Sequence, residues 1–255
     1  MSRVSAWLLV GAALALSGCP GRVPIVPPQM VTAEGLLEDV AVRRAATTSL
    51  KARARLRSGL AGVWAREAVV VRRPRDVRVD VLSPFGLALA LGTNGHVLWA
   101  FPPDEGVRYE GPATPDNLSR FLGASVRVED LVDILLGVPP VRELIGPPVL
   151  RRPDQDYYRI DLPHDEGVQA LWFASDTLEL ERAEEWIADR LVLRVAFDDY
   201  RDAFPHAIDV AVPPTGVEAN LRYVQVERNA VVDGSVFAPP PAPRALPIDS
   251  IHVDR

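Results

Sequence analysis

Cysteine is nearly absent from this 255-residue chain, in which Cys19 stands alone. An intrachain disulfide is therefore excluded, and so is a metal site built from paired cysteines. Histidine is also scarce, and its four copies are too dispersed to form a ligand pair on one helix face. The 28 basic residues are outnumbered by 34 acidic ones, so a net charge of −6 gives the chain no general attraction to nucleic acid.

Motifs for catalysis are missing as well. The chain contains no Gly-x-Ser-x-Gly elbow, no HExxH pair and no phosphate-binding loop. The acidic pairs Glu184-Glu185 and Asp198-Asp199 point to opposite faces if they lie on strands, so neither can act as two facing carboxylates. The triplet at 164–166, His-Asp-Glu, falls in an expected loop without a visible partner. We expect these groups to be solvated, and we expect no enzyme activity and no cofactor.

The first residues have the pattern of an export signal. Arg3 precedes an uncharged apolar run at 6–16, which is too short to span a bilayer. Leu16-Ser17-Gly18-Cys19 follows it and resembles the lipobox of bacterial lipoproteins. The resemblance implies a signal peptide at 1–18 and lipidation of Cys19.

The segment after Cys19 is rich in proline. Residues 19–32 have little helical or strand character, which favours an extended tether between the acylated cysteine and the folded part. Pro20 stands where many inner-membrane lipoproteins carry Asp, so we expect a lipid-anchored protein at the outer membrane, with its domain facing the periplasm.

Most of the remaining chain has the period of β-strands. Residues 50–58 alternate apolar with basic side chains, which predicts a strand with one dry face and one basic face. The basic row, Lys51 to Arg57, is interpreted as a solvated face, with contact to acidic lipid as the alternative. Similar alternation at 76–82 and 191–200, together with the Asn94-Gly95 turn signal, predicts an antiparallel meander of about eleven strands.

Three helices interrupt this pattern. They are expected at 33–49, 116–123 and 128–137, the last of them ending at Gly137. The tail at 237–250 is expected to be irregular. With no internal repeat and no dividing linker, residues 33–255 are predicted to form one mainly β (α+β) domain.

Four segments resemble the LolA/LolB superfamily of bacterial lipoprotein carriers, in particular a LolB-like lipoprotein family. They are KARARL (51–56), RVDVLSPFGLALALGTNG (78–95), RVEDLVDILLGVPP (127–140) and GSVFAPPPA (234–242). The resemblance implies an unclosed, curved, antiparallel β-barrel-like sheet with a helical lid around an apolar cavity. It further implies partners, namely a periplasmic LolA-like carrier and the acyl chains of lipoproteins, and a role in accepting or inserting lipoproteins or lipids at the outer membrane.

Two sets of residues carry these expectations. The membrane-insertion loop of the resemblance falls on Ser83, Pro84, Phe85 and Gly86, with Phe85 at the tip; a ring buried in the turn is the alternative. The expected lining of the acyl cavity is one shared concave face, made by Val79, Val81, Leu89, Trp99, Phe101, Leu193 and Val195. A dry packed core is the alternative to a cavity, and it would suit a structural or assembly lipoprotein that uses the same fold to bind proteins.

Overall fold

A computed structural model describes residues 30–58 and 64–251, which are dominated by one sheet. Its strands are β1 (Ser49–Ser58), β2 (Trp64–Arg72), β3 (Asp76–Ser83), β4 (Gly86–Asn94), β5 (Val97–Phe101), β6 (Val107–Pro112), β7 (Val149–Arg151), β8 (Tyr157–His164), β9 (Gly167–Ala174), β10 (Leu180–Ile187), β11 (Arg190–Arg201), β12 (Phe204–Val212), β13 (Val217–Arg228) and β14 (Arg244–Pro247). The helices are α1 (Ala33–Ala46), α2 (Pro115–Leu122) and α3 (Val128–Leu135), with 3₁₀ turns η2 (Gly234–Phe237) and η3 (Ile248–Ser250).

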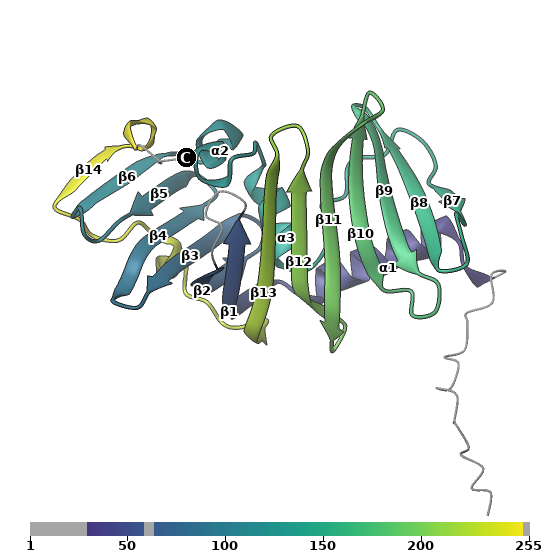
Figure 1. Cartoon of the computed structure of the whole chain (residues 1–255), viewed down its shortest axis with the longest axis horizontal. Helices are drawn as coiled ribbons and strands as arrows, with labels where there is room; N and C mark the ends of the chain where they lie inside the picture. The colour runs from purple at the N-terminus through teal and green to yellow at the C-terminus, as the bar shows by residue number, and fades with distance from the viewer. Residues whose placement is uncertain (1–29, 59–63, 252–255) are drawn as a thin grey trace, which may run out of the picture.

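Two meanders form this sheet. The order across it is β14-β6-β5-β4-β3-β2-β1-β13-β12-β11-β10-β9-β8-β7. The first meander, β1 to β6, joins the second, β7 to β13, where β1 pairs antiparallel with β13. Figure 1 shows the strands side by side along the long axis, with β14 and β7 at opposite edges. The expected class is confirmed: the sheet is large, curved, antiparallel except for β14, and unclosed.

Alternation explains which face of each strand is dry. In β1, Ala52 and Ala54 are buried, whereas Lys51 and Arg53 are exposed. The same period carries the buried face through β2, where Val69 and Val71 are almost fully covered. Because side chains alternate between the two faces of a strand, these apolar rows join into one concave core surface.

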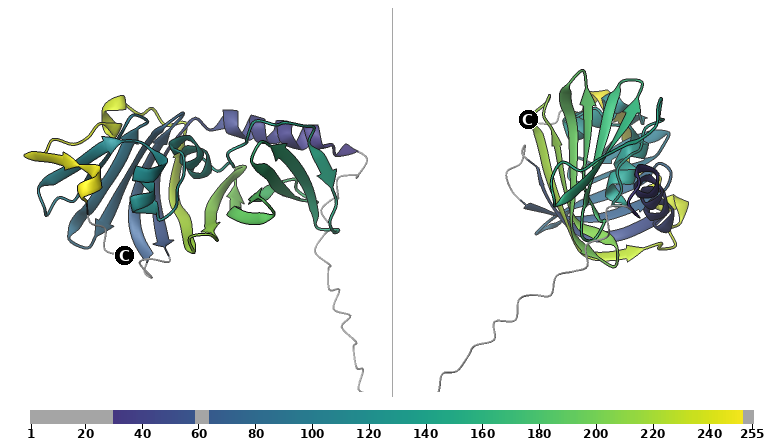
Figure 2. Two further views of the ribbon diagram at one scale, coloured as in Figure 1. Left: turned by 90° about the horizontal axis from the view of Figure 1, so that it is seen from above. Right: turned by 90° about the vertical axis from the view of Figure 1, so that its right-hand side faces the viewer.

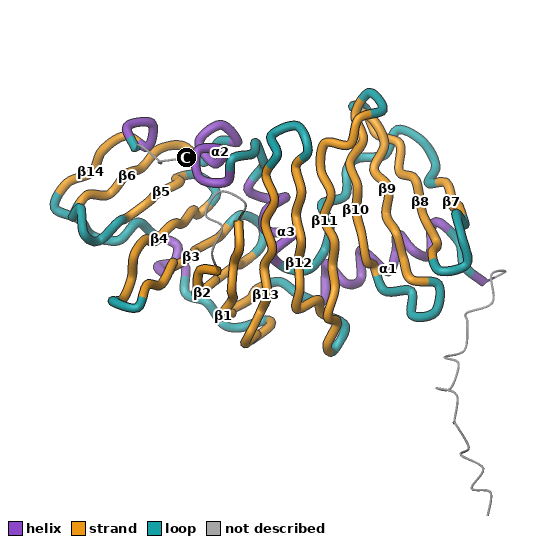
Figure 3. The backbone as a smooth tube through the Cα atoms, viewed as in Figure 1, coloured by secondary structure: helices purple, strands orange, loops and turns teal. Residues whose placement is uncertain are grey.

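Helices cover the concave face. Thr32 caps α1 by accepting a hydrogen bond from the Gly35 backbone, and Gly123 ends α2 in the left-handed conformation that favours glycine. Figure 2 shows α1 running lengthwise over the second meander, and the backbone trace in Figure 3 shows α2 and α3 near the middle of the molecule. Arg43 of α1 donates to the Leu178 carbonyl 3.2 Å away, which ties the helix to the β9–β10 turn. Among the described residues, no helix is long and apolar enough to cross a membrane.

The segment after β13 crosses the outer, convex face. Its backbone carbonyls accept hydrogen bonds from the outward side chains of five strands, and the Phe237 ring is fully buried there. The donors are Lys51, Arg72, Arg78, Trp99 and Arg108, and the acceptors are the carbonyls of Val231, Val232, Val236, Phe237 and Pro240. Several basic residues on the outer face therefore form hydrogen bonds with this covering segment, whereas others face water.

Three sequence expectations need correction. The sheet has 14 strands rather than about eleven, partly because the short edge strands β7 and β14 were missed. The tail at 237–250 is not irregular throughout, since it contains β14 and η3. The first helix ends at Ala46 rather than at 49, because Ser49 already belongs to β1.

Candidate functional site

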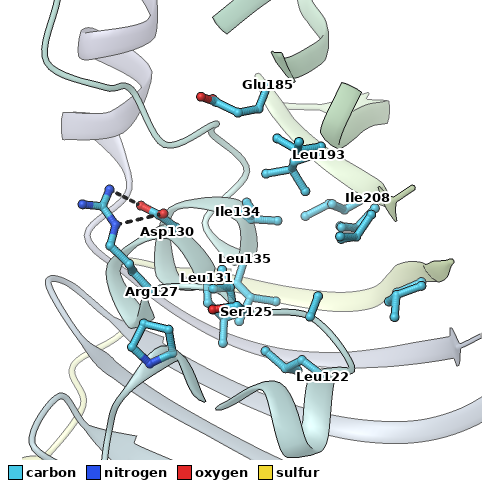
Figure 4. Close-up of a pocket in the computed structure, with 18 of the residues that line it drawn as sticks. Leu122, Ser125, Arg127, Asp130, Leu131, Ile134, Leu135, Glu185, Leu193 and Ile208 are labelled. Carbon is cyan, nitrogen blue, oxygen red and sulfur yellow. Dashed lines mark hydrogen bonds and ion pairs between the residues drawn. The ribbon is translucent and has the colours of Figure 1, made fainter. Parts of the chain in front are cut away.

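A cavity of about 1110 Å³ lies between the concave face of the sheet and the helices α2 and α3. Ligand pockets commonly measure roughly 300–1,000 Å³, so this one is large. Its apolar wall is contributed by both meanders and both helices. The aliphatic and aromatic lining includes Leu56, Val69, Val77, Val79, Val81, Leu91, Phe121, Leu122, Leu131, Ile134, Leu135, Leu193, Ile208, Val210 and Leu221. Figure 4 shows the α3 side chains facing Leu193 and Ile208 across the space.

Helix α3 is held over the cavity by polar contacts at its carboxyl end. Tyr223 donates its hydroxyl hydrogen to the Leu135 carbonyl over 2.7 Å. Asp133 forms ion pairs with Arg73 and, at 3.1 Å, with Arg44. Burial raises the pKa of Asp133, and the arginines oppose that shift without overcoming it. These contacts anchor one face of α3 and leave Leu131, Ile134 and Leu135 facing the cavity.

One end of the cavity is polar. Asp130 of α3 pairs with Arg127 at 2.9 Å and with Arg142 at 2.8 Å. Nearby, His164 Nε2 lies 2.6 Å from Glu185 Oε1, and both side chains are almost fully buried. Burial raises the pKa of Glu185, whereas His164 and Arg142 act to lower it.

This polar end corrects two expectations. His164 is the last residue of β8 rather than part of a loop, and it has Glu185 as a partner. Glu184 and Glu185 do point to opposite faces, but neither is solvated, since both are buried. Glu185 faces the cavity, and Glu184 contacts Arg194 and Trp186 on the convex side. The pair Asp198-Asp199 is exposed, as expected.

Glu67 is a functional candidate that sequence reasoning missed. It is 5% exposed, lines the cavity, and lies on the inner face of β2 opposite Val81 and Ala54. Burial raises the pKa of Glu67 to about 7. The signal was present in the sequence, because Glu67 takes the same alternation phase as Val69 and Val71 in an otherwise apolar row.

Three of the residues expected to share the concave face line the cavity. They are Val79 and Val81 of β3 and Leu193 of β11. Leu89 and Val195 lie on the same face, since they pair with Val81 and Ala183, but they pack in the surrounding core and do not line the space.

Trp99 and Phe101 were assigned to the wrong face. Trp99 pairs with Gly92, which in turn pairs with Arg78, so its ring lies on the convex side with the outward residues. There the indole is fully buried and donates to the Phe237 carbonyl over 2.9 Å. Phe101 shares this face because it is two residues away on the same strand.

The loop Ser83-Pro84-Phe85-Gly86 protrudes from the end of the β3–β4 hairpin. Ser83 Oγ accepts from the Phe85 backbone at 3.2 Å and donates to the Gly86 carbonyl at 3.1 Å. Gly86 has a φ of 124°, which an L side chain rarely adopts. Phe85 is 100% exposed, so the alternative of a ring buried in the turn is wrong.

The basic row of β1 is solvent-exposed, as expected. Arg53, Arg55 and Arg57 face away from the core, and none of them forms an ion pair within the described residues. Lys51 instead donates to the Val231 carbonyl at 3.0 Å. Cys19, the signal peptide and most of the tether lie outside the described residues.

No group of three or more potential metal-ligating side chains occurs in the described part of the chain. No protein-family model and no curated protein sequence matches the chain. Similarity is found instead among solved structures.

A LolA superfamily protein from Nitrosomonas europaea aligns with a TM-score of 0.52 and 19% identity, over 82% of this chain and 98% of that one. The chain has a LolA/LolB-like fold. A DUF1329 family protein from Desulfovibrio piger aligns with a TM-score of 0.51 and 14% identity, over 81% and 97%. A domain from Vibrio parahaemolyticus, assigned to outer membrane lipoprotein sorting, aligns with a TM-score of 0.50 and 13% identity over the same shares. The LolA/LolB-like fold expected from the sequence is thereby confirmed.

Proposed function

We propose that this chain is a lipid-anchored protein whose LolA/LolB-like cavity binds acyl chains, and that it accepts or inserts lipoproteins or lipids at the outer membrane. The observation that carries the proposal is the large cavity with a mostly aliphatic wall between sheet and helices. Binding of an apolar chain against such a wall is favourable by roughly 25 cal/mol per Å² of apolar surface removed from water. The Vibrio parahaemolyticus domain with the same fold is assigned to outer membrane lipoprotein sorting, which supports the membrane and the class of cargo.

Filling the cavity tests this function. Val79→Trp places a large ring among the lining side chains, so affinity for N-phenyl-1-naphthylamine, a fluorescent apolar ligand, should fall about tenfold. Val224→Trp, at a position 60% exposed on β13, is the matched control and should bind like the wild type. Titration of both variants by fluorescence decides the matter. Absence of ligand uptake by the wild-type chain would refute the carrier function and favour a protein-binding role for the same fold.

The anchor has its own test. We expect Cys19→Ser to abolish incorporation of a palmitate analogue, because the thiol accepts the lipid in the lipobox pattern of Leu16-Ser17-Gly18-Cys19. The readout is metabolic labelling followed by membrane fractionation. Label retained by the Ser variant would remove the lipoprotein assignment without bearing on the cavity.

A further inference from the structure

Glu67 is a carboxyl group placed among aliphatic side chains. On the inner face, Val81, Glu67, Ala54 and Tyr223 form one row across β3, β2, β1 and β13. Ala54 has a small side chain, and Val69 is the next inward residue after Glu67 on β2. The carboxyl therefore borders the cavity with aliphatic neighbours on both adjacent strands.

No described residue forms a hydrogen bond or ion pair with Glu67. Tyr223, in the same row, gives its only hydroxyl hydrogen to the Leu135 carbonyl and has none left to donate. A carboxyl in a mostly apolar wall without a donor on the protein is less stable than one that accepts a hydrogen bond. A ligand that supplies a donor at this position makes that bond, so Glu67 favours ligands that carry one.

The remaining charge of the cavity wall disfavours anions. The lining holds two arginines against six acidic residues. Both arginines, Arg127 and Arg142, already contact Asp130 at 2.9 and 2.8 Å. The described part of the wall thus offers no unpaired cation to a carboxylate or phosphate. Glu185 Oε2 lies 3.9 Å from Arg142, whereas the Glu67 carboxyl lines the cavity with no hydrogen bond or ion pair to a described group.

We propose that Glu67 accepts a hydrogen bond from an N–H group, of an amine or an amide, at the polar end of a bound hydrocarbon chain. The cavity then selects such chains over free fatty acids. This inference rests on the proposed function and narrows its ligand class. An N-acyl amide, as at an acylated amino terminus, and a lipid amine share the N–H chemistry that Glu67 would recognise.

Matched ligands distinguish these sources. Hexadecylamine, N-hexadecylacetamide and hexadecanoate compete for N-phenyl-1-naphthylamine bound to the full chain carrying Cys19→Ser, at about pH 8, where Glu67 is mostly ionised. We expect the amine and the amide to bind about tenfold more tightly than hexadecanoate. A larger advantage for the amine than for the amide identifies a charged donor as the preferred group.

Variants at Glu67 test its role directly. Glu67→Gln keeps the size and an acceptor oxygen but removes the charge, so the amide should bind as before and the advantage of the amine over hexadecanoate should shrink without disappearing. Glu67→Leu removes the acceptor and should abolish both advantages. Glu218→Gln, an exposed acid on β13, is the control and should bind all three ligands like the wild type. Melting curves verify that each variant is folded.

The outcomes separate the two proposals. Equal affinities for the three ligands in the wild type, or an unchanged advantage of the amine and the amide in Glu67→Leu, overturn the inference while acyl binding stands. If no chain displaces the fluorescent ligand and that ligand itself does not bind, the proposed function fails and the inference fails with it.

Discussion

Phe85 is the one large hydrophobic side chain that the described part of the molecule leaves fully in water. Its neighbours Leu82 and Leu87 are also exposed, at 39% and 37%, so the end of the β3–β4 hairpin presents a small apolar tip. Arg66 pairs with Leu82 across the strands, which sets a basic residue beside that tip. An apolar tip with a neighbouring cation suits contact with an anionic membrane surface.

We therefore predict that Phe85→Glu weakens binding of the unlipidated chain to anionic liposomes by roughly tenfold or more, since a buried Phe contributes about 1.5–3 kcal/mol. The free energy of unfolding should stay within about 0.5 kcal/mol of the wild type, because the ring packs on nothing. Flotation and thermal melts measure the two quantities. Val231→Glu, at a position 93% exposed outside the loop, is the control. A steep loss of stability in Phe85→Glu would contradict the exposed loop.

The hairpin of β4 and β5 depends on one close contact. A Cβ on Gly92 would lie 2.3 Å from Cζ2 of Trp99, so the indole lies directly over the glycine. The guanidinium carbon of Arg78 also lies over this ring, 5.7 Å from its centroid. The pairing of Gly92 with Trp99 thus fixes how the outer face of the first meander packs.

Gly92→Ala should destabilise the protein by about 1–3 kcal/mol, because the buried indole cannot move aside without losing its bond to Phe237. Chemical denaturation followed by tryptophan fluorescence measures this change. Gly146→Ala is the matched control, since its Cβ would make an ordinary contact with Pro163 at 3.4 Å. Equal stability of the two variants would show that the Trp99 contact does not restrict the strand pair.

At the scale of the whole molecule, the sheet is covered on both faces by segments distant in sequence. Helices lie on the concave side, and the segment from Ala230 to Pro240 lies on the convex side of the first meander. Its Phe237 packs under Arg72, whose guanidinium lies 5.1 Å from the ring centroid. The segment therefore covers the face of the first meander opposite to the cavity.

Removal of residues 230–255 should therefore unfold the chain or lower its melting temperature steeply, because Trp99 loses its cover and its hydrogen-bond acceptor. Removal of residues 241–255 keeps Phe237 and should cost less, since it deletes β14 and η3 but leaves the convex cover in place. Differential scanning calorimetry compares the two truncations. Similar losses in both would mean that β14, not the segment around Phe237, stabilises this half.

Local patterns were enough for much of the fold. Alternation in 50–58 and 76–82 identified β1 and β3, and Asn94-Gly95 identified a hairpin in which the Asn94 side chain accepts from two backbone amides. Period-two patterns are reliable here because each strand is long and has one dry face. The three-residue β7 and four-residue β14 are too short to show such a period, so only pairing with β8 and β6 reveals them.

By itself, the sequence determined that this is a β-rich chain with three helices, a protruding Pro-Phe-Gly turn and a lipobox-like start. Only the tertiary structure decided which apolar rows face the cavity. Trp99 follows the alternation of its strand, but its ring is buried on the convex side, where its indole donates to the carbonyl of Phe237, 138 residues away. His164 and Glu185 likewise meet only because β8 and β10 flank β9. Periodicity is a local property of a strand, whereas the side on which that strand is covered depends on what the rest of the chain packs against it.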